Sequence, residues 1–152
     1  MSEQPTLPEG TAGLPGRVLG VDLGARRVGL ALSDPLRTIS SPFQTISMST
    51  EAALARSLAA LCRERQVSLV VIGLPLSADG SEGPGCARAR RLVAALVKAG
   101  IPSVVHDESW SSRDAEDALR ETGKTRRNAK EKVDAIAASL VLRDYLEGAS
   151  RT

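Results

Sequence analysis

The stretch VLGVDLGARRVGLALSD, residues 18–34, combines two apolar runs with a carboxylate and a short basic turn. Residues 17–23 and 28–33 have the composition of buried strands, and the Gly-Ala-Arg-Arg segment between them is typical of a turn, so a β-hairpin is predicted. Asp22 lies inside the first strand, with apolar residues on both sides. Burial of an unpaired carboxylate is costly. Asp22 is therefore expected to be neutralised, hydrogen-bonded to backbone amides, or bound to a metal ion.

The rest of the chain alternates between helical and strand patterns. A third strand is expected within residues 37–48, interrupted or placed at an edge by Pro42. The later elements are a helix over 51–65 capped by Thr50, a strand over 68–75, a helix over about 84–98 stopped by Gly100, a strand over 101–108, a helix between Ser111 and Gly123, and a helix over about 129–146. This order predicts an α/β fold with a mixed sheet, antiparallel at its start and parallel later. One domain is expected over 17–147, between a disordered tail at 1–16 and a short tail at 148–152.

Composition narrows the classes of partner. With one Trp, one Tyr and one Phe in 152 residues, an aromatic platform for stacking bases is not expected. The two cysteines lie in no metal-ligand spacing, which favours a reduced, cytoplasmic protein. No apolar run reaches the roughly 18 residues of a membrane span, and the N-terminal segment lacks the features of a signal peptide. A membrane is therefore not an expected partner.

Three acids stand out by their position. Asp22 lies in the first strand, Glu108 ends the last strand, and Asp134 borders the apolar stripe of the final helix. Sites in α/β sheets form at the carboxyl ends of strands, so these acids are expected to meet if the first and last strands flank that point. Hard oxygen ligands of this kind suit Mg²⁺ or Mn²⁺, and a pair of such ions supports phosphodiester hydrolysis.

Simpler interpretations of these acids remain open at this point. Asp134 alone is typical of a solvated helix residue, and Glu108 of an acid near a helix entry. Asp107 stands beside Glu108 and weakens the choice of one acid over the other. His106, the one histidine, is expected to have a core or supporting role, and Trp110 to pack or to lie at the rim of a substrate site.

Basic residues gather near two of these acids. A solvated helix start is the simpler interpretation of the segment from Lys124 to Lys132, and phosphate contact along a nucleic-acid backbone is the functional one. Because the segment leads directly into Asp134, phosphate contact is favoured. The predicted nucleic-acid-binding residues are Arg26, Arg27, Lys124, Arg126, Arg127, Lys130 and Lys132.

Four motifs together resemble the YqgF family, also called RuvX, of RNase H-like nucleases. They are VLGVDLGARRVGLALSDP, VVIGLPLSADGSEG, VVHDESWSS and KVDAIAASLVLRDYLE, in this order, and the match covers about residues 17–147. The resemblance implies an RNase H-like fold with a five-stranded mixed sheet and a metal-dependent nuclease of structured nucleic acid. By motif position it implies that Asp22, Glu108 and Asp134 are the catalytic acids and metal ligands. The family is described as processing the 5′ end of the pre-16S ribosomal RNA, and resolution of Holliday junctions is the alternative, by analogy with RuvC.

The chain departs from the family pattern after Glu108. Ser109 and Trp110 stand where the family usually has Arg and Leu, which removes one expected substrate or supporting contact. RNase H-like nucleases commonly use four acids, and Asp34 and Asp107 are weak candidates for the fourth.

The main hypothesis is a cytoplasmic, Mg²⁺- or Mn²⁺-dependent endonuclease that acts on structured RNA or branched DNA. A ribosomal precursor particle is a further candidate partner, and the protein is expected to be a monomer or a homodimer. A non-catalytic ribosome-assembly factor on the same fold is the second hypothesis. An actin-like nucleotide binder that uses the Asp-Leu-Gly turn is the third.

Overall fold

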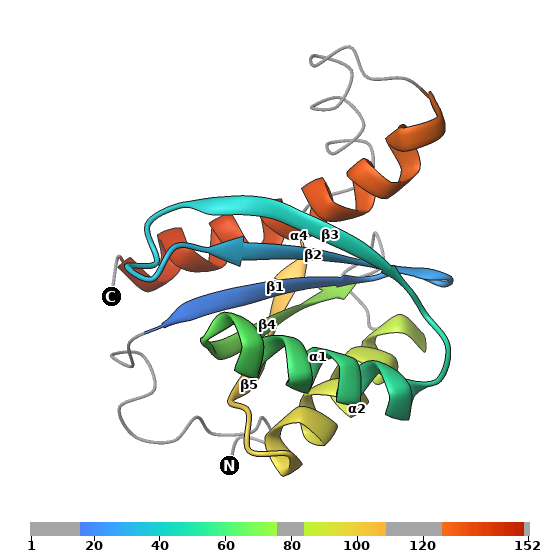
Figure 1. Cartoon of the computed structure of the whole chain (residues 1–152), viewed down its shortest axis with the longest axis horizontal. Helices are drawn as coiled ribbons and strands as arrows, with labels where there is room; N and C mark the ends of the chain where they lie inside the picture. The colour runs from blue at the N-terminus through green and yellow to red at the C-terminus, as the bar shows by residue number, and fades with distance from the viewer. Residues whose placement is uncertain (1–15, 76–83, 109–125, 151–152) are drawn as a thin grey trace.

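A five-stranded sheet with helices on both faces forms the fold (Figure 1). The structure is a computed structural model and describes residues 16–75, 84–108 and 126–150. In chain order the elements are β1 (Arg17–Leu23), β2 (Arg27–Ser33), β3 (Ser40–Ser47), α1 (Glu51–Arg65), β4 (Val67–Pro75), α2 (Pro84–Lys98), β5 (Ser103–Glu108) and α4 (Arg126–Ser150). None of the helices in these ranges is long and apolar enough to cross a membrane.

The strand order is β3-β2-β1-β4-β5, and it confirms the predicted mixed sheet. β1 pairs antiparallel with β2, and β2 antiparallel with β3, whereas β1 with β4 and β4 with β5 are parallel. The predicted hairpin is therefore present as β1 and β2. β4 lies between β1 and β5, so the carboxyl ends of all three parallel strands lie at one edge of the sheet.

The two faces of the sheet are covered by different helices. α4 covers one face, and α1 and α2 cover the other (Figure 1). Because side chains alternate along a strand, each central strand contributes to both layers. In β1, Leu19 and Val21 pack on the side of α1 and α2, whereas Val18 packs on the side of α4. This alternation decides which face each polar side chain can reach.

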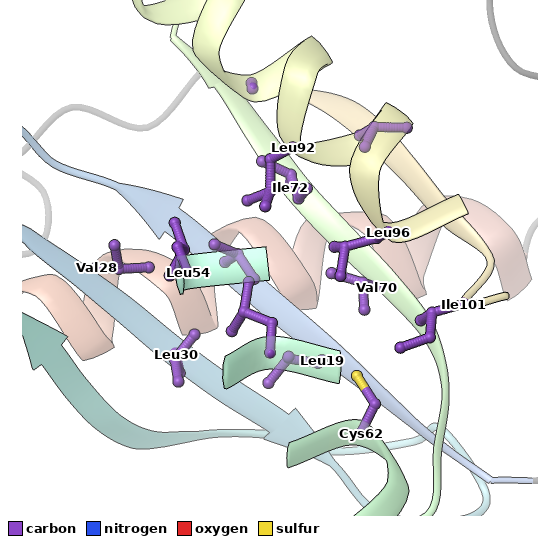
Figure 2. Close-up of a cluster of buried hydrophobic side chains, with 14 of the residues drawn as sticks. Leu19, Val28, Leu30, Leu54, Cys62, Val70, Ile72, Leu92, Leu96 and Ile101 are labelled. Carbon is purple, nitrogen blue, oxygen red and sulfur yellow. The ribbon is translucent and has the colours of Figure 1, made fainter. Parts of the chain in front are cut away.

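The larger apolar core lies between the sheet and the pair α1 and α2. Figure 2 shows Leu19, Leu30 and Ile72 from the sheet directed towards Leu54 of α1 and Leu92 of α2. Thr50 caps α1, since its hydroxyl accepts a hydrogen bond from the Ala53 N–H at 3.0 Å. Gly100 adopts a φ of +89° after α2, as expected for a residue that ends a helix. The predicted N-cap and helix stop are thus both confirmed.

Glycines on β1 and β2 bring α4 unusually close to the sheet. A Cβ added to Gly20 would lie 2.8 Å from the Cβ of Leu142 and 3.0 Å from the carbonyl oxygen of Ala138. A Cβ added to Gly29 would overlap the carbonyl oxygen of Asp134. The position of α4, and of any side chain it carries towards β1, therefore depends on these two residues.

Several predicted boundaries differ from the observed ones. β3 continues through Pro42, which is tolerated because β3 is an edge strand and its register with β2 shifts there. α4 begins at Arg126 instead of 129 and continues to Ser150, so residues 148–150 are helical and not a tail. The predicted helix between Ser111 and Gly123, the tail at residues 1–15 and the last two residues lie outside the described residues.

The loop after β2 is organised by Asp34. Its carboxylate accepts hydrogen bonds from the backbone N–H groups of Thr38 at 2.8 Å and Ile39 at 2.7 Å, and from the Thr38 hydroxyl at 2.9 Å. These bonds, chiefly the one from Ile39, lower the pKa of Asp34 to about 2. The preceding residue, Ser33, accepts a hydrogen bond from the N–H of Val18, so the loop lies beside the start of β1. Asp34 therefore lies near the start of β1, whereas Asp22 lies near its end. The Asp34 carboxylate is thus not a fourth acid of the site around Asp22.

Asp34→Ala is expected to lower the melting temperature at pH 7 by a few degrees, because four loop donors lose their acceptor. The pKa of Asp34 in the folded protein, about 2, lies below its ordinary value of 3.8. The stabilisation is therefore complete above about pH 4 and is lost as the pH falls towards 2. Melting curves of wild type and variant between pH 2 and 7 should converge at the acid end. Equal melting temperatures at pH 7 would contradict this account.

Candidate active site

Asp22 is directed to the face of the sheet that α4 covers. It is the second-last residue of β1, is half-buried, and pairs across the hairpin with Gly29 of β2. Directly opposed residues of an antiparallel pair point to the same face. The Gly29 position faces the backbone of Asp134 on α4. The Asp22 carboxylate consequently stands at the carboxyl end of β1, next to the part of α4 that carries Asp134.

Asp134 is held at this place by two contacts. Its carbonyl lies against Gly29, and its Oδ2 atom accepts a hydrogen bond from Nε of Arg27 at 2.6 Å. The side chain of Asp134 is 19% exposed and that of Arg27 is 40% exposed, so the ion pair is partly shielded from water. The structure thus brings two of the three predicted acids, Asp22 and Asp134, to one place.

Glu108 ends β5, where its Cα pairs with Pro75 of β4. β4 lies between β1 and β5, so the strands that carry Asp22 and Glu108 are not neighbours in the sheet. With neighbouring strands about 4.8 Å apart, the β1 and β5 backbones are separated by roughly 10 Å. The side chain of Glu108 lies outside the described residues. Its backbone position nevertheless belongs to the same edge of the sheet as Asp22.

Strand alternation separates Asp107 from Glu108. Asp107 pairs with Leu74, which belongs to the core beneath α1 and α2, and its side chain is exposed. Asp107 therefore belongs to the face opposite α4. Glu108 lies two residues after His106 on β5, so the two positions belong to the same face of the sheet. His106 contacts α4. Of the two adjacent acids, Glu108 is therefore the one whose position belongs to the same face of the sheet as Asp22.

Positions without side chains flank Asp22 on both neighbouring strands. Gly29 lies opposite Asp22 on β2. On β4, Ile72 pairs with Val21, so the next residue, Gly73, lies beside Asp22. Because Ile72 faces α1 and α2, Gly73 belongs to the α4 face. Asp22 therefore stands between two glycines on this face. At Gly29 the missing side chain lets the backbone of α4 approach β2 next to Asp22.

The carboxylates of Asp22 and Asp134 are suitable ligands for a hard divalent cation. Carboxylate oxygens are the ligands that Mg²⁺ and Mn²⁺ prefer. Asp22 and Asp134 supply such oxygens from a strand and a helix whose separation is fixed by Gly29. In the described part of the chain, no three His, Cys, Asp or Glu side chains gather closely enough to hold a metal ion. Within this part of the chain a metal ion would need ligands beyond Asp22 and Asp134, and Glu108 is the predicted one.

Arg88 is a residue of this region that the sequence did not indicate. From α2, its Nη2 atom donates to the carbonyl oxygen of Gly24 at 3.0 Å and lies 2.8 Å from Sδ of Met48. Gly24 begins the turn that joins Asp22 to Arg27, so Arg88 ties this turn to the opposite layer. No local pattern could have revealed the contact, because 64 residues separate the two partners.

His106 connects β5 to α4. Its Nε2 atom lies 2.6 Å from Oδ2 of Asp144 on α4, and its ring packs edge to face on Tyr145 with 5.7 Å between centroids. Burial raises the pKa of Tyr145 above its ordinary value. These contacts attach the edge strand β5 to α4, and Glu108 lies two residues further along β5.

The structure describes the side chains of only two of the residues that are predicted to contact nucleic acid, Arg26 and Arg27. Arg26 is exposed in the turn after β1, whereas Arg27 is engaged with Asp134. Only the backbone is described for the basic residues at the start of α4, which are Arg126, Arg127, Lys130 and Lys132. Lys124, Ser109 and Trp110 lie outside the described residues.

The fold is that of the RuvC-like Holliday junction resolvases, which belong to the RNase H-like class. Thermus thermophilus RuvC superimposes with a TM-score of 0.56 at 13% identity, covering 90% of this chain and 97% of that one. The yeast mitochondrial resolvase Ydc2 gives a TM-score of 0.51 at 12% identity, covering 93% and 84%. At this identity the likeness concerns the fold alone.

The chain belongs to the RuvX family, whose model, described as Holliday junction resolvase, matches residues 16–148. A relative from Anaeromyxobacter sp. (strain Fw109-5), named "Putative pre-16S rRNA nuclease", is 41% identical over 133 residues, which are 87% of this chain and 97% of that protein. A relative of the same name from Chloroflexus aggregans is 40% identical, covering 86% and 92%. The expected family and fold are thereby confirmed, and the chain is assigned to the nuclease class of hydrolases.

Proposed function

We propose that this chain is a divalent-metal-dependent nuclease that hydrolyses phosphodiester bonds at the 5′ end of the pre-16S ribosomal RNA. One observation carries the proposal: Gly29, which pairs with Asp22, lies against the backbone of Asp134, so both acids belong to the carboxyl end of β1. Asp22, Asp134 and Glu108 are the proposed metal ligands, with Mg²⁺ or Mn²⁺ as the ion.

Each of these residues would act from a rigid element. Asp22 is fixed by the β1–β2 ladder, and Asp134 by the contact between α4 and Gly29, so their separation changes little when substrate binds. A bound divalent ion supplies Lewis-acid stabilisation of the phosphoryl oxygens and lowers the pKa of water. The exposed Arg26 and the basic start of α4 would hold the nucleic-acid backbone on either side of the acids.

The choice of substrate is supported by the relatives of about 40% identity, whose names describe a nuclease of pre-16S rRNA. Such an enzyme would act in the cytoplasm, on a ribosomal precursor particle or its free RNA. Resolution of Holliday junctions is the second candidate, because the family model carries that description and solved structures with this fold are resolvases. The fowlpox virus resolvase, at a TM-score of 0.55, is known in complex with junction DNA. Resolution would require a homodimer, whereas a monomer would suffice for RNA trimming.

A side-by-side cleavage assay distinguishes these substrates. A labelled pre-16S rRNA 5′ leader and a mobile four-way DNA junction would each be incubated with Mg²⁺, with Mn²⁺ and with EDTA. We expect metal-dependent cleavage of the RNA leader at discrete positions and slower or no cleavage of the junction. Preferential cutting of the junction would favour the resolvase.

The same assay tests the non-catalytic alternative. Binding of the leader that persists in EDTA, with no cleavage of either substrate under any metal, would favour an assembly factor and contradict the nuclease. Binding is measured by fluorescence anisotropy on the same labelled leader.

A further inference from the structure

The ion pair between Arg27 and Asp134 joins two residues that the sequence assigns to different tasks. Arg27 was expected to contact substrate phosphates, and Asp134 to bind a metal ion. In the structure, Nε of Arg27 donates directly to Oδ2 of Asp134 at 2.6 Å. A hydrogen bond between two charged groups at this distance is of the strong, charge-assisted kind. The guanidinium therefore engages one of the two oxygens that Asp134 could offer to a metal ion.

Both partners of this ion pair are placed by the backbone. Arg27 is the first residue of β2, pairs with Ser47 of β3, and its carbonyl accepts a hydrogen bond from the N–H of Gly24 at 2.8 Å. A Cβ at Gly24 would lie 2.6 Å from that carbonyl oxygen, so only glycine fits this turn. Asp134 is fixed by the close approach of α4 to Gly29. The pairing is therefore built into the hairpin and the helix.

Electrostatics explains why a cation is held at this place. Asp22 and Asp134 converge at the end of β1, and two nearby carboxylates repel each other unless a positive charge lies between or beside them. Arg27 provides that charge in the absence of a metal ion. A divalent cation placed at the same carboxylate would be repelled by the guanidinium, and the repulsion is strong in a partly shielded site. Metal and Arg27 thus compete for Asp134.

We propose that Arg27 is the resident counter-ion of Asp134 in the metal-free protein and is exchanged for the divalent ion, which frees its guanidinium to bind a substrate phosphate. The inference rests on the proposed nuclease function, in which Asp134 is a metal ligand. With 40% of its side chain exposed, Arg27 lies at the mouth of the site, where its planar donors can engage a phosphate group. Metal binding thereby prepares the site for nucleic acid.

Metal affinity without nucleic acid tests the exchange directly. Mn²⁺ would be titrated calorimetrically into the full-length wild type, Arg27→Gln and Arg27→Lys. We expect Arg27→Gln to bind Mn²⁺ at least about tenfold more tightly, because the competing charge is gone, and Arg27→Lys to remain near wild type. The matched control is Arg26→Gln, which removes the same charge from the adjacent exposed residue and should change the affinity less than about twofold.

Nucleic-acid binding provides the second measurement. The loss of affinity caused by Arg27→Gln for a labelled four-way junction and for the RNA leader would be measured with Ca²⁺ and with EDTA. We expect a loss of about tenfold with Ca²⁺ and a much smaller one in EDTA, where Arg27 is occupied by Asp134. An equal loss under both conditions would overturn the exchange.

The outcomes separate this inference from the proposed function. If wild type binds Mn²⁺ and Arg27→Gln binds it equally or more weakly, the exchange is wrong while the metal site stands. If folded wild type binds no divalent ion, both the metal-dependent nuclease and the exchange are overturned. Circular dichroism of each variant confirms that it is folded before the titration.

Discussion

Asp22→Asn is expected to reduce the cleavage rate at least about 1,000-fold while the protein stays folded. The substitution keeps the size of the side chain and removes one negatively charged ligand at the end of β1. Because asparagine can still accept and donate hydrogen bonds at this position, the melting temperature should stay within a few degrees of wild type. Single-turnover cleavage at saturating Mn²⁺ and a thermal melt measure the two effects.

Asp107→Asn is the matched control for this prediction. It makes the same chemical change at the same edge of the sheet, but Asp107 belongs to the face opposite α4. Its cleavage rate should stay within about threefold of wild type, since surface charges change local potentials only modestly. Retained cleavage in folded Asp22→Asn would rule out Asp22 as a metal ligand. A comparable loss in Asp107→Asn would show that the assay responds to overall charge.

Gly29→Ala is expected to destabilise the protein by about 3 kcal/mol or more and to inactivate it. The added methyl group would overlap the backbone carbonyl of Asp134, and a carbonyl on a packed helix cannot rotate away. α4 must therefore move away from the sheet. This movement loosens the apolar packing between α4 and the sheet and carries Asp134 away from Asp22. Chemical denaturation and the cleavage assay report the two consequences.

Gly148→Ala is the matched control within the same layer. Gly148 lies in α4, and a Cβ added there meets nothing within 4 Å. Alanine in a helix interior is more favourable than glycine by about 0.5–1 kcal/mol, so this variant should be slightly more stable and fully active. If Gly29→Ala were as stable and as active as wild type, the close approach of α4 to β2 could not be the device that positions Asp134.

The β1–β2 hairpin could be predicted from the sequence because its determinants are local. Alternating apolar residues on both sides of a glycine-containing turn leave few alternatives for residues 17–33. The same locality explains why Thr50 and Gly100 were identified as helix boundaries. Asp22 was singled out because a charge in an apolar run is unusual whatever the tertiary structure.

Contacts between distant elements could not be predicted in the same way. Periodicity predicts that β1, β4 and β5 are buried strands, but it does not order them, so the position of β4 between β1 and β5 is known only from the structure. The pairing of Arg27 with Asp134 spans 107 residues, and the hydrogen bond from Arg88 to the turn comes from the opposite layer. Such contacts depend on which face of the sheet each helix covers.

The assignment of Asp107 and Asp34 shows how strand geometry refines a candidate site. From the sequence, both residues are candidates for a fourth acid of the site. Strand alternation places Asp107 on the face away from α4, and the loop after β2 uses Asp34 as a hydrogen-bond acceptor near the start of β1. Among the side chains that the structure describes, no third carboxylate joins Asp22 and Asp134 in a group that could hold a metal ion. Glu108 is the proposed third ligand.

The central claim is that the carboxyl end of β1 and the first half of α4 form a divalent-metal site. A crystal structure of the protein grown with Mn²⁺, with anomalous diffraction recorded at the manganese edge, tests it most directly. The account predicts an anomalous peak within about 2.5 Å of carboxylate oxygens of both Asp22 and Asp134, with Arg27 turned away from Asp134. A manganese peak that touches neither carboxylate, or no peak at saturating Mn²⁺, would contradict the account.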